Sequence, residues 1–327
     1  MKNILNMQYI MFYSFFLISI LLALSSNTFT GLWMSMEINM FSFIILMNTN
    51  NKKMLEKSTM IYFLTQSISS SLILLSFLLS FKEMEKPNFL LNFVIISVFL
   101  KVGLFPFHLW TLQIVENMSW KTCFILLTFQ KIIPLMAFYN MNQEKMILII
   151  LVINSVMASK TGLTTYSLRK ICVVSSMNHL SFLMLMMILS KKTFKIYFLI
   201  YMFSNMIMMK IFSSTNLNYM FHLMKKNKKT KITSMSLLIT LLSLMGIPPF
   251  LGFMPKMMSI LKMVELMYLF PTFLMLVNNT FMAYMYLRLT ISTMLMMKNM
   301  NKNLNKKEHK MNIMFLLLIM SPFTFMM

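Results

Sequence analysis

Long apolar stretches separated by short polar gaps recur along the whole chain. Most are about 20 residues long, the length that a helix needs to cross the hydrocarbon core of a bilayer. They are continuously apolar rather than alternating, which favours helices over the strands of a membrane barrel. We therefore predict an all-α, polytopic membrane protein with about eleven transmembrane helices. The predicted spans are 4–24, 28–47, 59–79, 89–110, 120–139, 146–163, 171–189, 196–213, 232–261, 267–289 and 311–325.

The fourth and ninth predicted spans are the long ones, and each contains helix breakers near its middle. The fourth has Gly103 and Pro106, and the ninth has Gly246, Pro248 and Pro249. Proline removes a helix hydrogen bond, and a membrane tolerates this where the freed backbone groups face protein or a hydrated cavity. An ordinary proline kink is the alternative interpretation. Because a lysine accompanies each break, we favour a functional role.

The positions of the two breaks indicate an internal repeat. If each half has five spans, the broken helix is the fourth in both halves. A five-span unit inverts its successor, and paired broken helices in inverted halves point to the site of a transporter. We expect a single membrane domain over 1–327, built from two inverted five-helix repeats at 1–142 and 143–295 and a C-terminal helix at 311–327.

The composition agrees with a protein that lies mostly in the membrane. The chain has 327 residues, of which 58% are hydrophobic and 12% charged, about half the charged fraction of a soluble domain. Its net charge of +22 raises the possibility of nucleic-acid binding. The basic residues, however, mostly lie in short gaps between apolar stretches. They concentrate in the loops on the N-terminal side, which predicts that the N-terminus faces the positive-inside compartment.

The sequence gives no sign of a bound cofactor in this chain. The two cysteines, Cys123 and Cys172, have no spacing typical of a zinc or iron–sulfur site. Neither the dinucleotide-binding nor the P-loop glycine pattern occurs. We therefore expect no NADH, flavin or metal cluster to bind here.

Among the charged residues inside predicted spans, we single out Glu37, Lys101, Lys131 and Lys256. A lysine at the centre of a span costs about 2.5–3.5 kcal/mol, so such residues usually mark a polar path. Extension of the side chain to the membrane surface is the alternative. That alternative suits the residues toward span ends, Lys210 and Arg288, and partly suits Lys256.

A proton path needs groups that gain and lose charge near neutral pH. Burial disfavours a charged lysine and a nearby carboxylate favours it, so a Lys–Glu pair titrates as one coupled unit. Arginine stays protonated and could not serve. His179 occupies the span that corresponds to the Glu37 span in the predicted repeat. A lone histidine is more often a hydrogen-bonded core residue, so a relay role for His179 is a minority hypothesis; His108, beside the first break, carries less weight still.

Ordered motifs along the chain carry a family resemblance. They are GLWMSMEIN (31–39), YFLTQ (62–66), KVGLFPFHLW (101–110), QKIIPL (130–135), SLRK (167–170), SSMNH (175–179) and GIPPFLGFMPK (246–256). Together they resemble the subunit 2 family of mitochondrial NADH:ubiquinone oxidoreductase, respiratory complex I, in an arthropod-like form. This family is similar to cation/proton antiporters.

The resemblance implies a proton-translocating subunit of the membrane arm, part of an enzyme but without redox chemistry of its own. It implies that Glu37 pairs with Lys101, that Lys131 is the central relay, and that Lys256 lies toward the far half-channel. NAD, FMN, iron–sulfur clusters and ubiquinone would be in partner subunits. Other membrane-arm subunits and a lipid such as cardiolipin would be the partners, with no nucleic acid.

The implied location is the mitochondrial inner membrane, with the N-terminus toward the matrix and the C-terminus toward the intermembrane space. Two alternatives stay open. One is a secondary cation/proton antiporter or another antiporter-like subunit of the same complex. The other is a structural scaffold that conducts no protons.

Overall fold

The described chain is helical and forms two compact units. The structure is a computed structural model that describes residues 2–48, 53–82, 87–139, 144–224 and 231–300. The units are Met1–Gln143 and Glu144–Met327. Within the described ranges there is no strand, and a single isolated antiparallel bridge joins Ser167 to Tyr219. The last predicted span, 311–325, lies outside the described residues.

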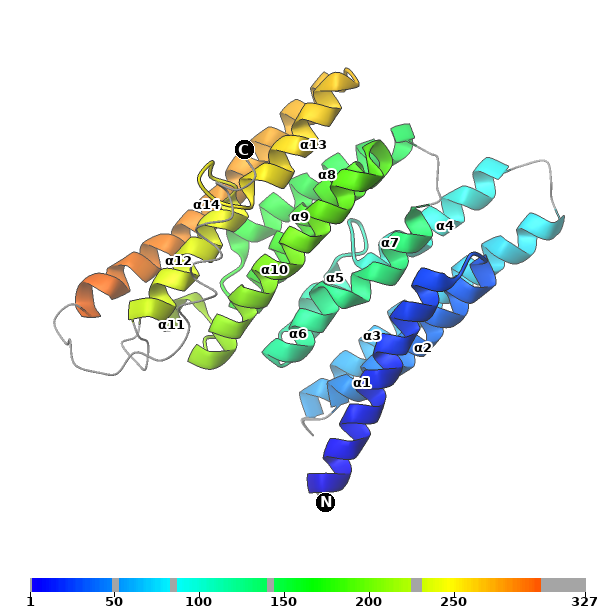
Figure 1. The fold of residues 1–327 in the computed structure, drawn as a ribbon, viewed down its shortest axis with the longest axis horizontal. Helices are drawn as coiled ribbons and strands as arrows, with labels where there is room; N and C mark the ends of the chain where they lie inside the picture. Colours follow the sequence, from blue (N-terminus) through cyan, green and yellow to red (C-terminus); the bar gives the residue numbers. More distant parts are fainter. Residues whose placement is uncertain (1, 49–52, 83–86, 140–143, 225–230, 301–327) are drawn as a thin grey trace. The chain divides into compact units, whose positions relative to one another are not determined.

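The first unit is a bundle in which α3 and α7 each pack against several other helices (Figure 1). α3 packs against α2, α4 and α5, and α7 packs against α1, α2 and α4. The helices are α1 (Lys2–Ser25), α2 (Phe29–Met47), α3 (Lys53–Lys82), α4 (Pro87–Val102), α5 (Leu109–Val115), α6 (Trp120–Leu127), the 3-10 helix η2 (Phe129–Lys131) and α7 (Ile132–Phe138).

The second unit is built around α9, which packs against α8, α10 and α13 (Figure 1). Nearly every α9 residue is buried, from Leu168 to Met187. α14 closes the unit by packing against α8, α12 and α13. The helices are α8 (Glu144–Thr164), α9 (Leu168–Leu189), α10 (Lys191–Thr215), α11 (Met220–Met224), α12 (Lys231–Met245), α13 (Phe253–Glu265) and α14 (Leu269–Met300).

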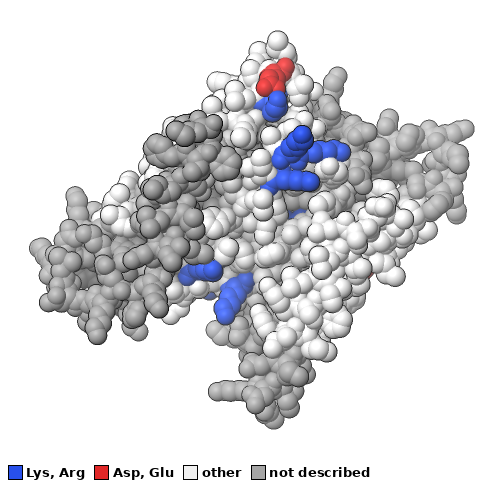
Figure 2. Space-filling model, viewed as in Figure 1, with Lys and Arg blue, Asp and Glu red and all other residues white. Residues whose placement is uncertain are grey.

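Six helical stretches in the described ranges are long and apolar enough to cross a membrane. They are Phe29–Met47, Leu55–Leu79, Trp120–Phe138, Ile147–Thr164, Leu168–Leu189 and Lys191–Thr215. Large apolar side chains also cover the outside of both units, as at Met60 and Leu199, which are 65% and 66% exposed. Figure 2 shows that the described surface on the viewed face is mostly uncharged. Such a surface is suited to lipid or to partner helices rather than to water.

Many serine side chains inside the bundles form hydrogen bonds within their own helix. Buried serines donate to the carbonyl three residues earlier, as Ser97 does to Val94 O at 2.6 Å and Ser155 does to Val152 O at 2.7 Å. This bonding lets a helix carry hydroxyl groups through an apolar environment without an unmet donor.

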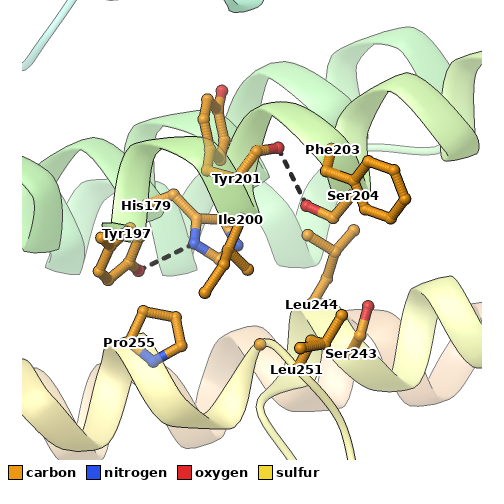
Figure 3. Close-up of a pocket in the computed structure, with 11 residues that line it drawn as sticks. His179, Tyr197, Ile200, Tyr201, Phe203, Ser204, Ser243, Leu244, Leu251 and Pro255 are labelled. Atoms are coloured by element: carbon orange, nitrogen blue, oxygen red, sulfur yellow. Dashed lines mark hydrogen bonds between the residues drawn. The ribbon is translucent and has the colours of Figure 1, made fainter. Parts of the chain in front are cut away.

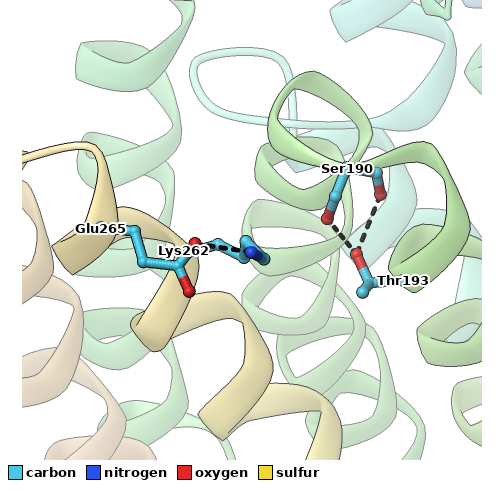
Figure 4. A network of polar contacts seen from close by, with 4 residues as sticks. All are labelled: Ser190, Thr193, Lys262 and Glu265. Carbon is cyan, nitrogen blue, oxygen red and sulfur yellow. Dashed lines mark hydrogen bonds and ion pairs between the residues drawn. The ribbon is translucent and has the colours of Figure 1, made fainter.

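Polar pairs stabilise two helix ends in the second unit (Figure 4). Lys262 and Glu265 form an ion pair of 2.5 Å near the end of α13. The hydroxyls of Ser190 and Thr193 are hydrogen-bonded at the corner between α9 and α10. Ser190 is the N-cap residue of α10, and Oγ1 of Thr193 also donates to Ser190 O at 2.9 Å.

Candidate functional site

The first break follows Lys101, which lies in the last turn of α4. The helix ends at Val102, and Gly103 has a φ of +75°. A Cβ at Gly103 would lie 2.5 Å from Cγ2 of Thr111, so both the backbone conformation and the close packing require glycine. Pro106 lies in the connecting loop and is exposed, and α5 then begins at residue 109.

Neutral side chains satisfy the backbone groups that this break leaves open. Nε1 of Trp110 donates to Leu100 O at 3.0 Å, and Nε2 of Gln66 donates to Lys101 O at 3.3 Å. The last carbonyls of a helix have no partner within it, and leaving them unpaired in an apolar interior is costly. The ammonium of Lys101 is therefore not what holds these two carbonyls.

Lys101 and Glu37 belong to the same unit but are not in direct contact. Lys101 is 7% exposed, and the half-buried Glu37 on α2 acts on it electrostatically. Within the described residues no ion pair of 4.0 Å or less joins them. His108 is buried in the loop after the break, with its ring 5.9 Å from that of Phe105. The loop that follows Lys101 therefore carries a buried titratable group.

Lys131 lies at an interruption that our sequence analysis did not predict. The predicted span 120–139 is divided into α6, η2 and α7, and Lys131 is the last residue of η2. Pro134 explains the interruption, because it offers no N–H to the carbonyl of Gln130 and its ring crowds that carbonyl. Thr128 leaves the helical conformation with φ −121° and ψ −74°. Lys131 is 5% exposed.

Neighbouring polar groups hold the interruption in place. Oγ1 of Thr128 donates to Phe124 O at 2.6 Å. The hydroxyl of Tyr62 on α3 donates to Oε1 of Gln130 at 3.3 Å. The segment YFLTQ (62–66) of α3 thus contacts both breaks of the first unit. Its first residue, Tyr62, bonds to Gln130 beside Lys131, and its last residue, Gln66, bonds to the carbonyl of Lys101.

The second unit has a break between α12 and α13. α12 ends at Met245, and Gly246 has a φ of +83°. The loop then folds back on the end of α12, so closely that a Cβ at Gly252 would lie 1.8 Å from Ser243 O. Pro248 and Pro249 are exposed in this loop. Only glycine allows the backbone to approach so closely at residue 252.

The ammonium of Lys256, which lies on α13, caps the end of α12 at this break. Its Nζ donates to Leu244 O at 2.8 Å, to Met245 O at 3.0 Å and to Oδ1 of Asn279 at 2.9 Å. Lys256 is 3% exposed. The end of a helix carries a partial negative charge, so a cation there is stabilised without a carboxylate partner.

His179 lies across a small cavity from the same break (Figure 3). It is 5% exposed on α9, and its Nδ1 is hydrogen-bonded to the Tyr197 hydroxyl at 3.0 Å. The cavity is also lined by Tyr201 from α10 and by Leu244 and Pro255 from the broken helix. The volume of this cavity is about 20 Å³, enough for about one water molecule.

The structure therefore groups the candidate residues within each unit. Glu37 and Lys101 interact in the first unit, whereas His179 and Lys256 approach the same broken helix in the second. Asn279 was not among the predicted site residues, although an amide within an apolar span was a visible signal. Among the described residues, no three His, Cys, Asp or Glu side chains are placed to hold a metal ion.

The charged residues toward span ends behave differently from each other. Lys210 is exposed on α10. Arg288 instead turns inward, where its guanidinium donates to Leu163 O at 3.3 Å and to Thr165 O at 2.8 Å and lies 5.2 Å from the centre of the Tyr166 ring. Arg288 therefore caps the end of α8.

Apolar helices, interrupted at three places that each have a buried lysine, are the features of an antiporter-like membrane protein. The chain belongs to the NADH:quinone oxidoreductase/Mrp antiporter transmembrane family, whose profile matches residues 26–283.

Relatives among known proteins agree with this family. The chain is 31% identical to NADH-ubiquinone oxidoreductase chain 2 of Locusta migratoria, over 90% of this chain and 88% of the relative. It is 32% identical to the protein of the same name from Anopheles gambiae, over 90% of each.

Solved structures share the fold. A chain of respiratory complex I from Thermus thermophilus superposes with a TM-score of 0.82 at 17% identity, covering 88% of this chain and 70% of that one. A chain of the Mrp complex from Dietzia sp. DQ12-45-1b gives a TM-score of 0.76 at 13% identity, covering 83% of this chain and 57% of that one.

Proposed function

We propose that this chain is a proton-translocating subunit in the membrane arm of NADH:ubiquinone oxidoreductase. Electron transfer from NADH to ubiquinone takes place in partner subunits, and the energy released there drives a proton across the membrane through this chain. The observation that carries the proposal is the placement of three nearly fully buried lysines, Lys101, Lys131 and Lys256, each at a helix break. The named insect relatives support the choice of complex.

The proposed pathway uses lysine and glutamate as a relay. Glu37 modulates the charge of Lys101, Lys131 is the central relay, and Lys256 serves the second unit with His179 beside it. Each lysine is buried, so its charged form is sensitive to the movement of another charge nearby. Two inverted five-helix repeats, one in each unit, would give the pathway its two halves.

The proposed setting is the mitochondrial inner membrane, with the N-terminus in the matrix. The partners are other membrane-arm subunits and an anionic lipid such as cardiolipin. NAD, FMN, iron–sulfur clusters and ubiquinone belong to the partner subunits. The apolar outer surface of both units supports membrane burial.

The test is the number of protons translocated per electron by the assembled complex that carries Lys131→Met. We expect a reduced ratio, because methionine keeps the length of the side chain but cannot hold a proton. Lys210→Met is the matched control, since Lys210 is exposed and lies away from any helix break, and it should keep the normal ratio. An unchanged ratio in Lys131→Met would refute the relay and favour the structural scaffold.

The structural similarity to the Mrp complex raises a second candidate, cation/proton antiport. This function requires a metal cation to move against protons. Sodium-dependent proton movement in proteoliposomes that contain the chain, without NADH or quinone, would favour antiport. Its absence, together with NADH-dependent pumping by the complex, would favour the proposed function.

A further inference from the structure

Asn279 of α14 supplies one of the three acceptors around the Lys256 ammonium. Its Oδ1 lies 2.9 Å from Nζ, and the other two acceptors are the carbonyls of Leu244 and Met245 at the end of α12. An ammonium has three N–H donors and no acceptor, so all three donors are used and the amide must present its oxygen. Asn279 is thus the only side chain among these acceptors.

All three acceptors are neutral. In the described residues no carboxylate forms an ion pair with Lys256, and none lines the adjoining cavity. The positive charge is therefore balanced by backbone and amide dipoles alone. Dipoles stabilise a buried ammonium less strongly than a carboxylate in contact would, so the lysine can release its proton without leaving an uncompensated negative charge behind.

Arg288 is a second cation that caps a helix end, but its charge is permanent. It also caps a helix end through two carbonyls, those of Leu163 and Thr165. Arginine remains charged under all relevant conditions, whereas lysine can be neutralised when buried. The chain thus has a fixed cap on α8 and a cap on α12 that can lose its charge.

The neighbouring amide provides a natural comparison. Nδ2 of Asn278 donates to Oγ of Ser155 on α8 at 3.0 Å, so it ties α14 to α8. Asn279, one residue further, ties α14 to the broken helix through Lys256. Two adjacent asparagines therefore have different partners, and only one of them contacts a titratable group.

We propose that Asn279 is a positioning residue, which holds the ammonium of Lys256 against the end of α12 and thereby sets how readily this lysine releases its proton. This inference rests on the proposed function. The titratable side chains that face the adjoining cavity from the packed elements are His179 of α9 and Tyr197 and Tyr201 of α10. None of them carries a negative charge near neutral pH.

The experiment compares the pH profile of proton translocation in the assembled complex, measured with a pH-sensitive dye in proteoliposomes. The variants are Asn279→Leu, which removes the acceptor at similar volume, and Asn279→Asp, which keeps an oxygen at the same place and adds negative charge. Asn278→Leu is the matched control. Lys256→Met tests the proposed function at this position separately.

We expect Asn279→Leu to lose translocation at high pH first. Without the acceptor the neutral amine of Lys256 is favoured. The alkaline limb of the profile, where translocation falls as the pH rises, should therefore move to lower pH by about 1–2 units. A shift of this size corresponds to the free energy of one hydrogen bond to a charged group. Asn279→Asp should move the limb to higher pH. Asn278→Leu should keep the position of the limb, because its partner does not titrate.

The outcomes separate the two proposals. If Lys256→Met translocates normally, the relay role of Lys256 is wrong and the inference falls with it. A second outcome is that Lys256→Met loses translocation while the alkaline limb lies at the same pH in Asn279→Leu and in the control Asn278→Leu. In that case only the positioning role of Asn279 is wrong. If Asn279→Leu does not assemble, Asn279→Asp decides: a shift to higher pH supports the inference, and an unmoved limb overturns it.

Discussion

Replacing Gly246 with alanine disturbs the second break at the point where it meets Lys256. Gly246 has a φ of +83°, a conformation that an L-residue adopts at a cost of roughly 1–2 kcal/mol. The added Cβ would lie 2.9 Å from Cδ and 3.3 Å from Nζ of Lys256. The methyl group therefore strains the backbone and pushes on the side chain that closes the break.

The displacement acts on three short hydrogen bonds. The Lys256 ammonium lies 2.8–3.0 Å from its acceptors, so a movement of a few tenths of an ångström away from Gly246 lengthens at least one of them. A hydrogen bond to a charged group contributes about 1.5–3 kcal/mol. If one of these hydrogen bonds is lost, then together with the backbone strain the arrangement of Lys256 at the end of α12 is destabilised by about 2.5–5 kcal/mol.

The assay is the ratio of protons translocated to electrons transferred by the assembled complex, with NADH oxidation measured in parallel. We expect Gly246→Ala to lower the ratio while NADH oxidation in the presence of an uncoupler persists. The control is Gly162→Ala, in the last turn of α8, where the new Cβ meets the flexible Met285 side chain at 3.1 Å. Equal ratios in the two variants would refute the view that the geometry of the break controls Lys256.

Three further substitutions test the structural roles. Trp110→Phe leaves Leu100 O without its indole donor, and should lower stability by about 1–3 kcal/mol, seen as a lower midpoint in thermal inactivation; an unchanged midpoint would contradict this. Arg288→Met should cost about 1.5–3 kcal/mol in the same assay without moving the pH profile of translocation, and a moved profile would be evidence against a fixed cap. Glu265→Gln removes an ion pair whose side chains are 41% and 58% exposed, so a thermal effect beyond about 1 kcal/mol would be unexpected.

Hydrophobic patterning predicted much of the helical framework, because a bilayer requires long apolar helices. The predicted span 28–47 coincides closely with α2, and 171–189 lies within α9. The prediction failed in detail at 120–139, where η2 interrupts the helix. Pro134 was a visible signal there, but it lies within an otherwise apolar span and its effect falls four residues earlier.

The partners of the buried charges were beyond the reach of the sequence. Lys256 and Asn279 are 23 residues apart, and no periodicity relates two helices that meet through a broken segment. The neutral donors Gln66 and Trp110 satisfy carbonyls at the end of α4, and this depends on how α3 and α5 pack. Sequence identifies where a charge in the membrane needs compensation, whereas packing decides which group provides it.

The central claim is that the buried lysines change their charge during turnover, and Lys131→Arg tests it most directly. Arginine keeps the positive charge and similar length but does not release its proton. The measurement is the proton-to-electron ratio of the assembled complex with Lys131→Arg, beside the unmodified complex. We predict a reduced ratio although the charge is conserved. A normal ratio would contradict the claim, because a fixed positive charge would then be sufficient.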